Sequence, residues 1–295
     1  MKKIGFIGVG IMGKSMVRNL MKAGYELHIF ARNQEKVEDV FREGAIFHST
    51  IGDCVSDVDV VISIVGFPQD VEEIYFDTGN ILDSAQEGTY LIDMTTTSPL
   101  LAQKIYEQGS EKGMFVLDAP VTGGDVGARE GTMSIMVGGE KEYFEACVPI
   151  FEAMGKNISY QGVAGSGQHC KLANQIMIAG ALSGLCEGFT YAKAKGLDLE
   201  KVMGAVATGS AASRQLDMLG PRIIKGDFAP GFYLRHFVKD MRLALIESNM
   251  SNLSLEMLSQ VLAIGEELEM RGLGDKGTQA LMKYYENEII EEDED

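Results

Sequence analysis

The chain has 295 residues, is 45% hydrophobic and carries a formal net charge of −17 at pH 7. Its length is about twice that of a typical domain, so two domains are expected. The negative charge would repel nucleic acid and anionic membrane surfaces, and we therefore expect neither as a partner. An anionic ligand must then be met by local basic groups or by backbone N–H groups.

Residues 3–24 predict a buried strand that runs through three glycines into an amphipathic helix. Gly8 would permit the tight turn, Gly10 would let the backbone approach a pyrophosphate, and Gly13 would let the helix pack closely on the sheet. The free N–H groups of the first helical turn would face the phosphates. A plain structural turn is the alternative. We predict a dinucleotide site made by Gly8, Val9, Gly10, Ile11, Met12 and Gly13.

Apolar runs rich in β-branched residues alternate with helical patterns over the first half of the chain. The expected strands are 3–8, 26–30, 58–64, 90–94 and 114–118, and 133–137 and 157–160 could extend the same sheet. This alternation predicts a parallel sheet covered on both faces, which is a doubly wound, Rossmann-type α/β domain. We place this domain over residues 1–163.

From residue 165 onward the strand pattern disappears, which predicts an all-α domain over residues 164–295. The expected helices are 167–195, 199–208, 215–224, 235–248, 254–271 and 279–286. The first would be about 40 Å long and would join the two domains. Its apolar stretch 172–192 carries polar residues and regularly spaced glycines, which favours a buried helix over a membrane span. The acidic block 291–295 is expected to be disordered.

The four cysteines are far apart and form no C-x-x-C pair, so they are expected to be reduced, mostly structural thiols. Met1 leads almost directly into the first strand, which indicates no signal peptide and a cytoplasmic protein. The four histidines are too scattered to form a ligand set, so no metal site is predicted.

The end of the second expected strand indicates which dinucleotide binds. An NAD site usually has an acidic residue here to bind the ribose 2′-hydroxyl, but this chain has Ala31, Arg32 and Asn33. Arg32 could pair with a 2′-phosphate, and Lys36 could be a second cation. NADP is therefore preferred, with NAD possible. The alternative is that Arg32 is solvated and Asn33 caps the next helix.

Four motifs together resemble one protein family. They are GVGIMG at 8–13, DAPVTGG at 118–124, GSGQHCKLAN at 165–174 and Lys239-Asp240. The chain resembles the β-hydroxyacid dehydrogenases, a group that contains 3-hydroxyisobutyrate dehydrogenase, tartronate semialdehyde reductase and the glyoxylate or succinic semialdehyde reductases. The resemblance covers all but the acidic tail. It implies a Rossmann-type domain, a helical second domain, a catalytic cleft crossed by the long helix, and homodimers or homotetramers built through the helical domain.

The resemblance makes Lys171 the catalytic residue. Reduction of a carbonyl by hydride transfer requires a proton donor, and a lysine ammonium can fill that role. Without the motif, a lone lysine on a helix would be interpreted as a solvated charge. Asn174 and Gln175 follow at helical spacing on the same face. We expect Asn174 to orient the reacting hydroxyl and Gln175, where the family often has Asn, to support it.

Thr122, Gly123 and Gly124 could bind a substrate carboxylate through a hydroxyl and backbone N–H groups, although a simple β-turn is the alternative. The family commonly has Ser at position 122, so the extra methyl group of Thr122 would narrow the pocket. By the resemblance, Lys239 contacts the nicotinamide ribose and substrate region, and Asp240 positions it. Phe232 is expected to line the pocket or to pack in the core.

The remaining expected contacts lie on loops. By the resemblance, Val65, Gly66 and Thr96 follow strands at the cofactor side, and the threonine hydroxyls could instead cap the next helix. Arg214 could pair with a second substrate carboxylate, but a surface salt bridge is the preferred interpretation.

The resemblance, together with Arg32 at the end of the second strand, implies an NADP-dependent oxidoreductase that interconverts a short β-hydroxyacid and its semialdehyde. The substrate is a small carboxylate-bearing aldehyde or hydroxyacid whose identity the sequence leaves open. One alternative is the related imine reductases, which typically lack the lysine found at position 171. Another is a cofactor-binding scaffold without turnover, which the presence of Lys171, Thr122 and Asn174 argues against.

Overall fold

The computed structural model describes residues 1–288, so the acidic tail at 291–295 lies outside the described residues. The chain divides into two compact units, Met1–Lys171 and Leu172–Asp295. The predicted boundary after residue 163 falls just before the helix Ser166–Ala194, which runs on past this division. Each unit has its own buried core.

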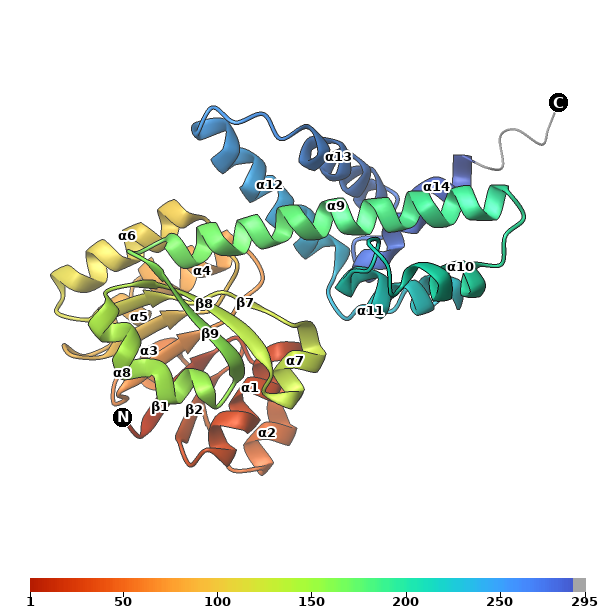
Figure 1. The fold of residues 1–295 in the computed structure, drawn as a ribbon. Coiled ribbons are helices and arrows are strands. Elements are labelled where there is room, and N and C mark those ends of the chain that lie inside the picture. The colour runs from red at the N-terminus through yellow and green to blue at the C-terminus, as the bar shows by residue number, and fades with distance from the viewer. Residues whose placement is uncertain (289–295) are drawn as a thin grey trace. The chain divides into compact units, whose positions relative to one another are not determined.

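The first unit contains a nine-stranded sheet in the order β3-β2-β1-β4-β5-β6-β8-β7, with β9 paired to β8 (Figure 1). Neighbouring strands pair in parallel along the row β3-β2-β1-β4-β5-β6. Alternate residues face opposite sides of a strand. Accordingly, Ile4 and Phe6 of β1 enter one hydrophobic core while Ile7 enters another. The sheet is therefore buried on both faces, and the predicted Rossmann-type class is confirmed. The strands are β1 (Lys3–Ile7), β2 (Glu26–Phe30), β3 (Ile46–His48), β4 (Val60–Ser63), β5 (Tyr90–Asp93), β6 (Phe115–Asp118), β7 (Val121–Thr122), β8 (Met133–Gly139) and β9 (Gly155–Gly162).

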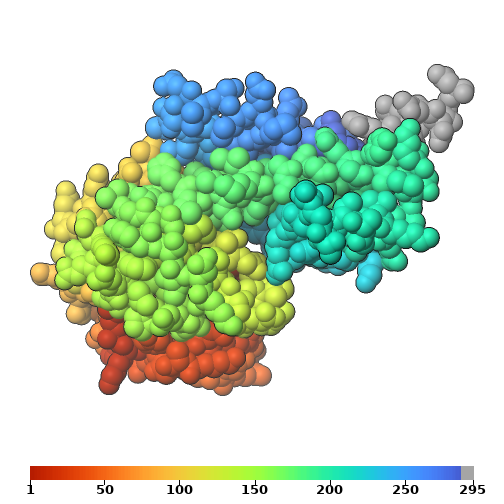
Figure 2. Space-filling view, in the orientation of Figure 1, coloured from red at the N-terminus to blue at the C-terminus, as the bar shows by residue number. Residues whose placement is uncertain are grey.

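Helices connect these strands. They are α1 (Ile11–Lys22), η1 (Gln34–Val37), α2 (Glu38–Arg42), α3 (Ile51–Val55), α4 (Pro68–Phe76), α5 (Ile81–Ser84), α6 (Pro99–Glu111), α7 (Gly124–Glu130) and α8 (Lys141–Glu152). α7 packs against α1, although more than 100 residues separate them in the sequence (Figures 1 and 2). The Asn19 side chain fixes this contact by donating to the Ala128 carbonyl at 2.7 Å.

Two strands were not expected from the sequence. β3 has three residues at the sheet edge, and β7 has two, so neither gives a clear period of alternation. The later strands do extend the sheet, as expected. β8, however, runs antiparallel to β6 and β7, so the sheet is parallel only over part of its width.

The second unit is helical in its described part. Its helices are α9 (Ser166–Ala194, which begins in the first unit), α10 (Leu199–Val206), α11 (Arg214–Ile224), α12 (Leu234–Met250), α13 (Glu256–Met270), η2 (Thr278–Leu281) and α14 (Met282–Glu288). The first five expected helices are present, and each begins and ends within two residues of its prediction. The last, expected at 279–286, is divided between the 3-10 helix η2 and the α-helix α14, which begins only at Met282. None of the helices among residues 1–288 combines the length and apolarity that crossing a membrane requires. The apolar stretch at 172–192 forms part of α9.

All four cysteines are free thiols, as predicted. Cys54, Cys147 and Cys186 are buried, and burial raises the pKa of each thiol to about 12. Cys170 is less buried, and burial raises its pKa as well. Cys54, Cys147 and Cys186 also belong to the hydrophobic cores, so burial and a raised pKa give these three thiols packing roles.

Candidate active site

The glycine turn after β1 has the geometry that a dinucleotide requires. Gly8 has φ +97°, and a Cβ there would lie 2.0 Å from the Ile64 carbonyl oxygen. A Cβ on Gly13 would lie 2.1 Å from the Gly8 carbonyl oxygen. A Cβ on Gly10 would meet no atom within 4 Å, and Gly10 precedes α1 without a side-chain cap. Gly8 and Gly13 are thus needed by the fold, whereas the space in front of Gly10 and the first turn of α1 fits a pyrophosphate.

This difference predicts that two similar substitutions have different effects. Gly10→Ala should leave the unfolding midpoint near that of the wild type but weaken dinucleotide binding about tenfold or more, because its methyl group would occupy the pyrophosphate space. Gly13→Ala should lower stability by several kcal/mol, since it forces the backbone apart. Thermal unfolding and fluorescence titration with NADPH measure the two effects. Equal loss of stability in both variants would contradict this division of roles.

Three polar residues form a row across the carboxyl edge of the sheet. Ser63, Asp93 and Asp118 are the last residues of β4, β5 and β6, and the strand register places each opposite the next. All three side chains are buried. Ligands of open α/β sheets bind outside this edge. The row therefore marks the side of the first unit where a ligand is expected.

Asp93 is a buried carboxylate with few partners. Its Oδ1 accepts hydrogen bonds from Ser63 Oγ at 2.8 Å and from the Thr95 backbone N–H at 3.1 Å. Its Oδ2 has no hydrogen-bond partner among residues 1–288. Burial raises the pKa of Asp93 from its ordinary value of 3.8 to about 6, and hydrogen bonds from Thr95 and Ser63 offset this only in part. The ionised form is therefore costly at neutral pH.

Because the pKa of Asp93 is raised on folding, this group makes the protein more stable at low pH. The contribution is fully present below about pH 3.8 and is lost as the pH rises through about 6. Relative to Asp93→Asn, the wild type should lose about 2 kcal/mol of unfolding free energy between pH 4 and pH 7. Urea unfolding at both pH values checks this. Asp83→Asn is the control, since Lys112 lowers the pKa of Asp83 and its trend should have the opposite sign.

The start of α9 is anchored to the same carboxyl edge. The two carboxylate oxygens of Asp118 accept from the Gly165 N–H at 2.7 Å and the Gln168 N–H at 2.8 Å. The Gln168 side chain donates to the Thr95 carbonyl at 2.7 Å and accepts from the Thr97 N–H at 3.0 Å. Lys171 follows one turn later, and only 6% of its surface is exposed. The sheet thus holds the helical turn that carries Lys171.

A close backbone approach makes this anchor possible. A Cβ on Gly138 would lie 2.5 Å from Asp118 Oδ1 and 2.7 Å from the backbone nitrogen of Gly167. No individual role was predicted for Asp118, Gln168 or Gly138 from the sequence. Asp118 could have been predicted as a site residue, because it is an acidic residue at the end of a buried strand.

The other expected residues of the first unit lie on loops after the strands. The Val65 N–H donates to Thr95 Oγ1 at 2.9 Å, so Thr95 fixes the loop that continues to Gly66. Thr96 is partly buried, and Thr122 ends β7 opposite Ser134. Gly123 and Gly124 then lead into α7, and no atom lies within 4 Å of a Cβ placed on Gly124.

Arg32 and Asn33 follow β2, as expected, and both side chains have hydrogen-bond partners within the first unit. Arg32 Nη2 donates to Asp70 Oδ1 and Glu73 Oε2, both at 2.9 Å. Arg32 is therefore paired with carboxylates in this structure. The Asn33 side chain accepts from the Lys36 N–H at 3.4 Å and caps η1, which was the alternative role considered for it.

Four polar side chains of the second unit form a continuous chain. Asn174 Nδ2 donates to Gln175 Oε1, and Gln175 Nε2 donates to Asp240 Oδ2, both at 2.7 Å. Lys239 Nζ lies 2.9 Å from Asp240 Oδ1. Asp240 has no exposed surface, so its carboxylate positions Lys239 and Gln175 from within the core.

The two remaining expected residues have different surroundings. Phe232 packs against the core of the second unit, and its ring stacks on His236 with a centroid distance of 6.2 Å. Arg214 is exposed at the start of α11, and Ser213 caps that helix. The surface salt bridge expected for Arg214 does not form within residues 1–288.

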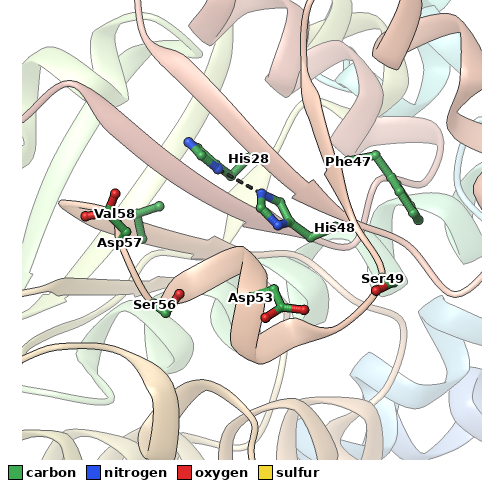
Figure 3. A pocket seen from close by; sticks show the side chains of 8 residues that line it. All are labelled: His28, Phe47, His48, Ser49, Asp53, Ser56, Asp57 and Val58. Atoms are coloured by element: carbon green, nitrogen blue, oxygen red, sulfur yellow. Dashed lines mark hydrogen bonds between the residues drawn. The ribbon is translucent and has the colours of Figure 1, made fainter.

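A separate hollow of about 490 Å3 lies in the first unit (Figure 3). His28 and His48 are joined there by a hydrogen bond of 2.8 Å between Nδ1 and Nε2, and Ser49, Asp53 and Asp57 complete much of the lining. Burial and the nearby His28 lower the pKa of His48. None of the expected site residues lines this hollow, and the described residues contain no group of three or more side chains suited to a metal ion.

Comparison with known proteins agrees with the glycine turn and with the helical second unit. Residues 3–162 match the model of the NAD binding domain of 6-phosphogluconate dehydrogenase. Residues 165–285 match the model described as NAD-binding of NADP-dependent 3-hydroxyisobutyrate dehydrogenase. The chain belongs to the β-hydroxyacid dehydrogenase family. The predicted family and the prediction of an oxidoreductase are therefore confirmed.

Individual members of this family are similar over most of the chain. An uncharacterized oxidoreductase, YkwC of Bacillus subtilis (strain 168), is 49% identical over 96% of this chain and 99% of its own length. The 2-hydroxy-3-oxopropionate reductase of Escherichia coli (strain K12) is 40% identical over 82% of this chain and 83% of its own. The structure of a Mycobacterium tuberculosis 3-hydroxyisobutyrate dehydrogenase with L-serine is 26% identical, with a TM-score of 0.87 over 96% of this chain and 98% of that one.

Proposed function

We propose that the protein is an NADP-dependent reductase that converts a short semialdehyde carboxylate to its β-hydroxyacid and also catalyses the reverse oxidation. The observation that carries this proposal is the position of Lys171. It is a nearly buried lysine one turn into a helix that Asp118 and Gln168 fix to the carboxyl edge of the sheet. That edge is where a dinucleotide-binding sheet holds its ligand.

The residues of the chain divide the chemistry as follows. The glycine turn and the first turn of α1 bind the pyrophosphate, and the bound nicotinamide supplies the hydride. Lys171 donates a proton from Nζ to the carbonyl oxygen, which becomes the hydroxyl group, and takes it back in the reverse reaction. Backbone N–H groups of Gly123 and Gly124, with the Thr122 hydroxyl, bind the substrate carboxylate. Asn174 orients the hydroxyl. Lys239 contacts the nicotinamide ribose and the substrate, and Asp240 positions it.

The family resemblance supports a proposal for the domain roles and the assembly. Residues 1–163 form the cofactor domain, and residues 164–295 form the substrate and assembly domain of a cytoplasmic homodimer or homotetramer. Exposed apolar side chains on the second unit support self-association, since Met177 is 73% and Met270 is 82% exposed.

The direct test is oxidation of NADPH and NADH by the purified protein in the presence of small aldehydes. Glyoxylate and the semialdehydes of tartronate, methylmalonate and succinate form the panel, and propanal is the matched aldehyde without a carboxylate. We expect turnover of at least one acid, faster with NADPH, and little with propanal. Turnover of cyclic imines alone, or dinucleotide binding without any turnover, would contradict the proposal.

A further inference from the structure

Two carboxylates of α4 hold Arg32, the cation that the sequence predicts for a ribose 2′-phosphate. Arg32 donates from the same nitrogen, Nη2, to Asp70 and Glu73. Pro68 starts α4 directly after the loop that follows β4, and the two acids lie three residues apart on one helix face. The end of β2 has no acidic residue, but α4 brings two acidic residues to the Arg32 side chain.

The charges of this group affect the two dinucleotides in opposite ways. Arg32, Asp70 and Glu73 together carry one net negative charge. A ribose 2′-phosphate carries about two negative charges at neutral pH and would compete with both carboxylates for the guanidinium. A ribose 2′-hydroxyl can instead donate a hydrogen bond to a carboxylate, as it does in NAD sites.

We infer that Asp70 and Glu73 determine the cofactor selectivity of this enzyme through Arg32. NADPH binds by drawing Arg32 away from the carboxylates, whereas NADH binds with the ion pairs intact. The chain therefore uses both dinucleotides, and its preference for NADPH is smaller than Arg32 alone would produce. This inference rests on the proposed function, because it concerns the same dinucleotide site.

Glu73 is the better residue to change. Asp70 also accepts the Phe67 N–H at 3.0 Å and so helps to begin α4, whereas Glu73 is half exposed and its side chain pairs with Arg32. Glu72 provides a matched control. It is the neighbouring residue on the same helix, and it pairs with Lys104 at 3.2 Å instead of Arg32. Glu73→Gln and Glu72→Gln therefore remove the same charge from the same helix.

The experiment is a fluorescence titration of the full chain with NADPH and with NADH. We expect Glu73→Gln to tighten NADPH binding about threefold to fivefold, the range of an exposed ion pair, and to leave NADH binding unchanged or weaker. Glu72→Gln should leave the ratio of the two dissociation constants unchanged. In an Arg32→Gln background, Glu73→Gln should no longer improve NADPH binding. The guanidinium for which the Glu73 carboxylate and the 2′-phosphate compete is then absent.

The outcomes separate this inference from the proposed function. The inference is wrong if Glu73→Gln and Glu72→Gln shift the ratio of the two dissociation constants equally. It is also wrong if Glu73→Gln still tightens NADPH binding without Arg32. In either case the negative charge of α4 as a whole, and not the pair with Arg32, affects binding. If the wild type binds dinucleotides but Glu73→Gln changes nothing, the inference also fails while the proposed function stands. If the wild type binds neither dinucleotide, both fail together.

Discussion

Lys171→Met is expected to abolish most of the reductase activity and leave the protein folded. Met is close to lysine in length and favours helices, so α9 should be maintained. Loss of a general acid typically costs about 10²-fold to 10⁴-fold in rate, and we expect kcat to fall by about 10³. The dissociation constant of NADPH should change by less than about threefold, since Lys171 acts on the substrate oxygen. Steady-state kinetics and fluorescence titration measure the two quantities.

Two further variants make this prediction specific. His169 is exposed two residues earlier on the same helix, and His169→Ala should leave kcat unchanged. Lys171→Ala should be partly rescued by added ethylamine, because a small amine can occupy the space that the side chain leaves and donate the proton. If Lys171→Met retains more than about a tenth of the wild-type kcat, the proton comes from another group.

The sequence predicts best those features whose signal is local. The glycine turn and the helices α9 to α13 have determinants within a few neighbouring residues, such as glycines and the helical period. β3 and β7 were missed because two or three residues do not show a period. Their strand structure depends on pairing with β2 and β8.

The candidate site was predicted as a set of residues and not as a network. Asp70 and Glu73 lie 38 and 41 residues from Arg32, and Gln175 lies 65 residues from Asp240. No spacing rule along the chain connects such pairs. The family motifs supplied Lys171 and Asn174, but the partners that hold Arg32 and the anchor of α9 come only from the three-dimensional arrangement.

Asp118 is the clearest example of such an anchor, and its removal should have a large effect. Its two carboxylate oxygens accept the N–H groups of Gly165 and Gln168 at the start of α9. Burial raises the pKa of Asp118, and these hydrogen bonds offset part of that rise. In Asp118→Ala both N–H groups would be buried without a partner, and each such group costs about 1–3 kcal/mol. We expect a loss of about 3 kcal/mol in the unfolding free energy of the first unit.

Asp198 offers a control with the same chemistry and a different environment. It caps α10 by accepting the N–H groups of Glu200 and Lys201, but it is exposed, so water can replace it. Asp198→Ala should therefore cost only about 1 kcal/mol and leave kcat unchanged. Urea unfolding followed by far-UV circular dichroism measures both losses, since the chain has no tryptophan.

Asp118 either positions Lys171 for catalysis or only stabilises the fold. The activity of Asp118→Ala distinguishes these two roles when it is measured under conditions in which the variant is folded. If the carboxylate holds Lys171 in place, kcat should fall at least about tenfold while NADPH binding at the glycine turn is retained, because only the α9 end of the site is displaced. Asp118→Asn keeps one acceptor and should recover part of both losses. A variant that is less stable but has the wild-type kcat would show that Asp118 supports the fold alone and that the position of Lys171 is fixed elsewhere.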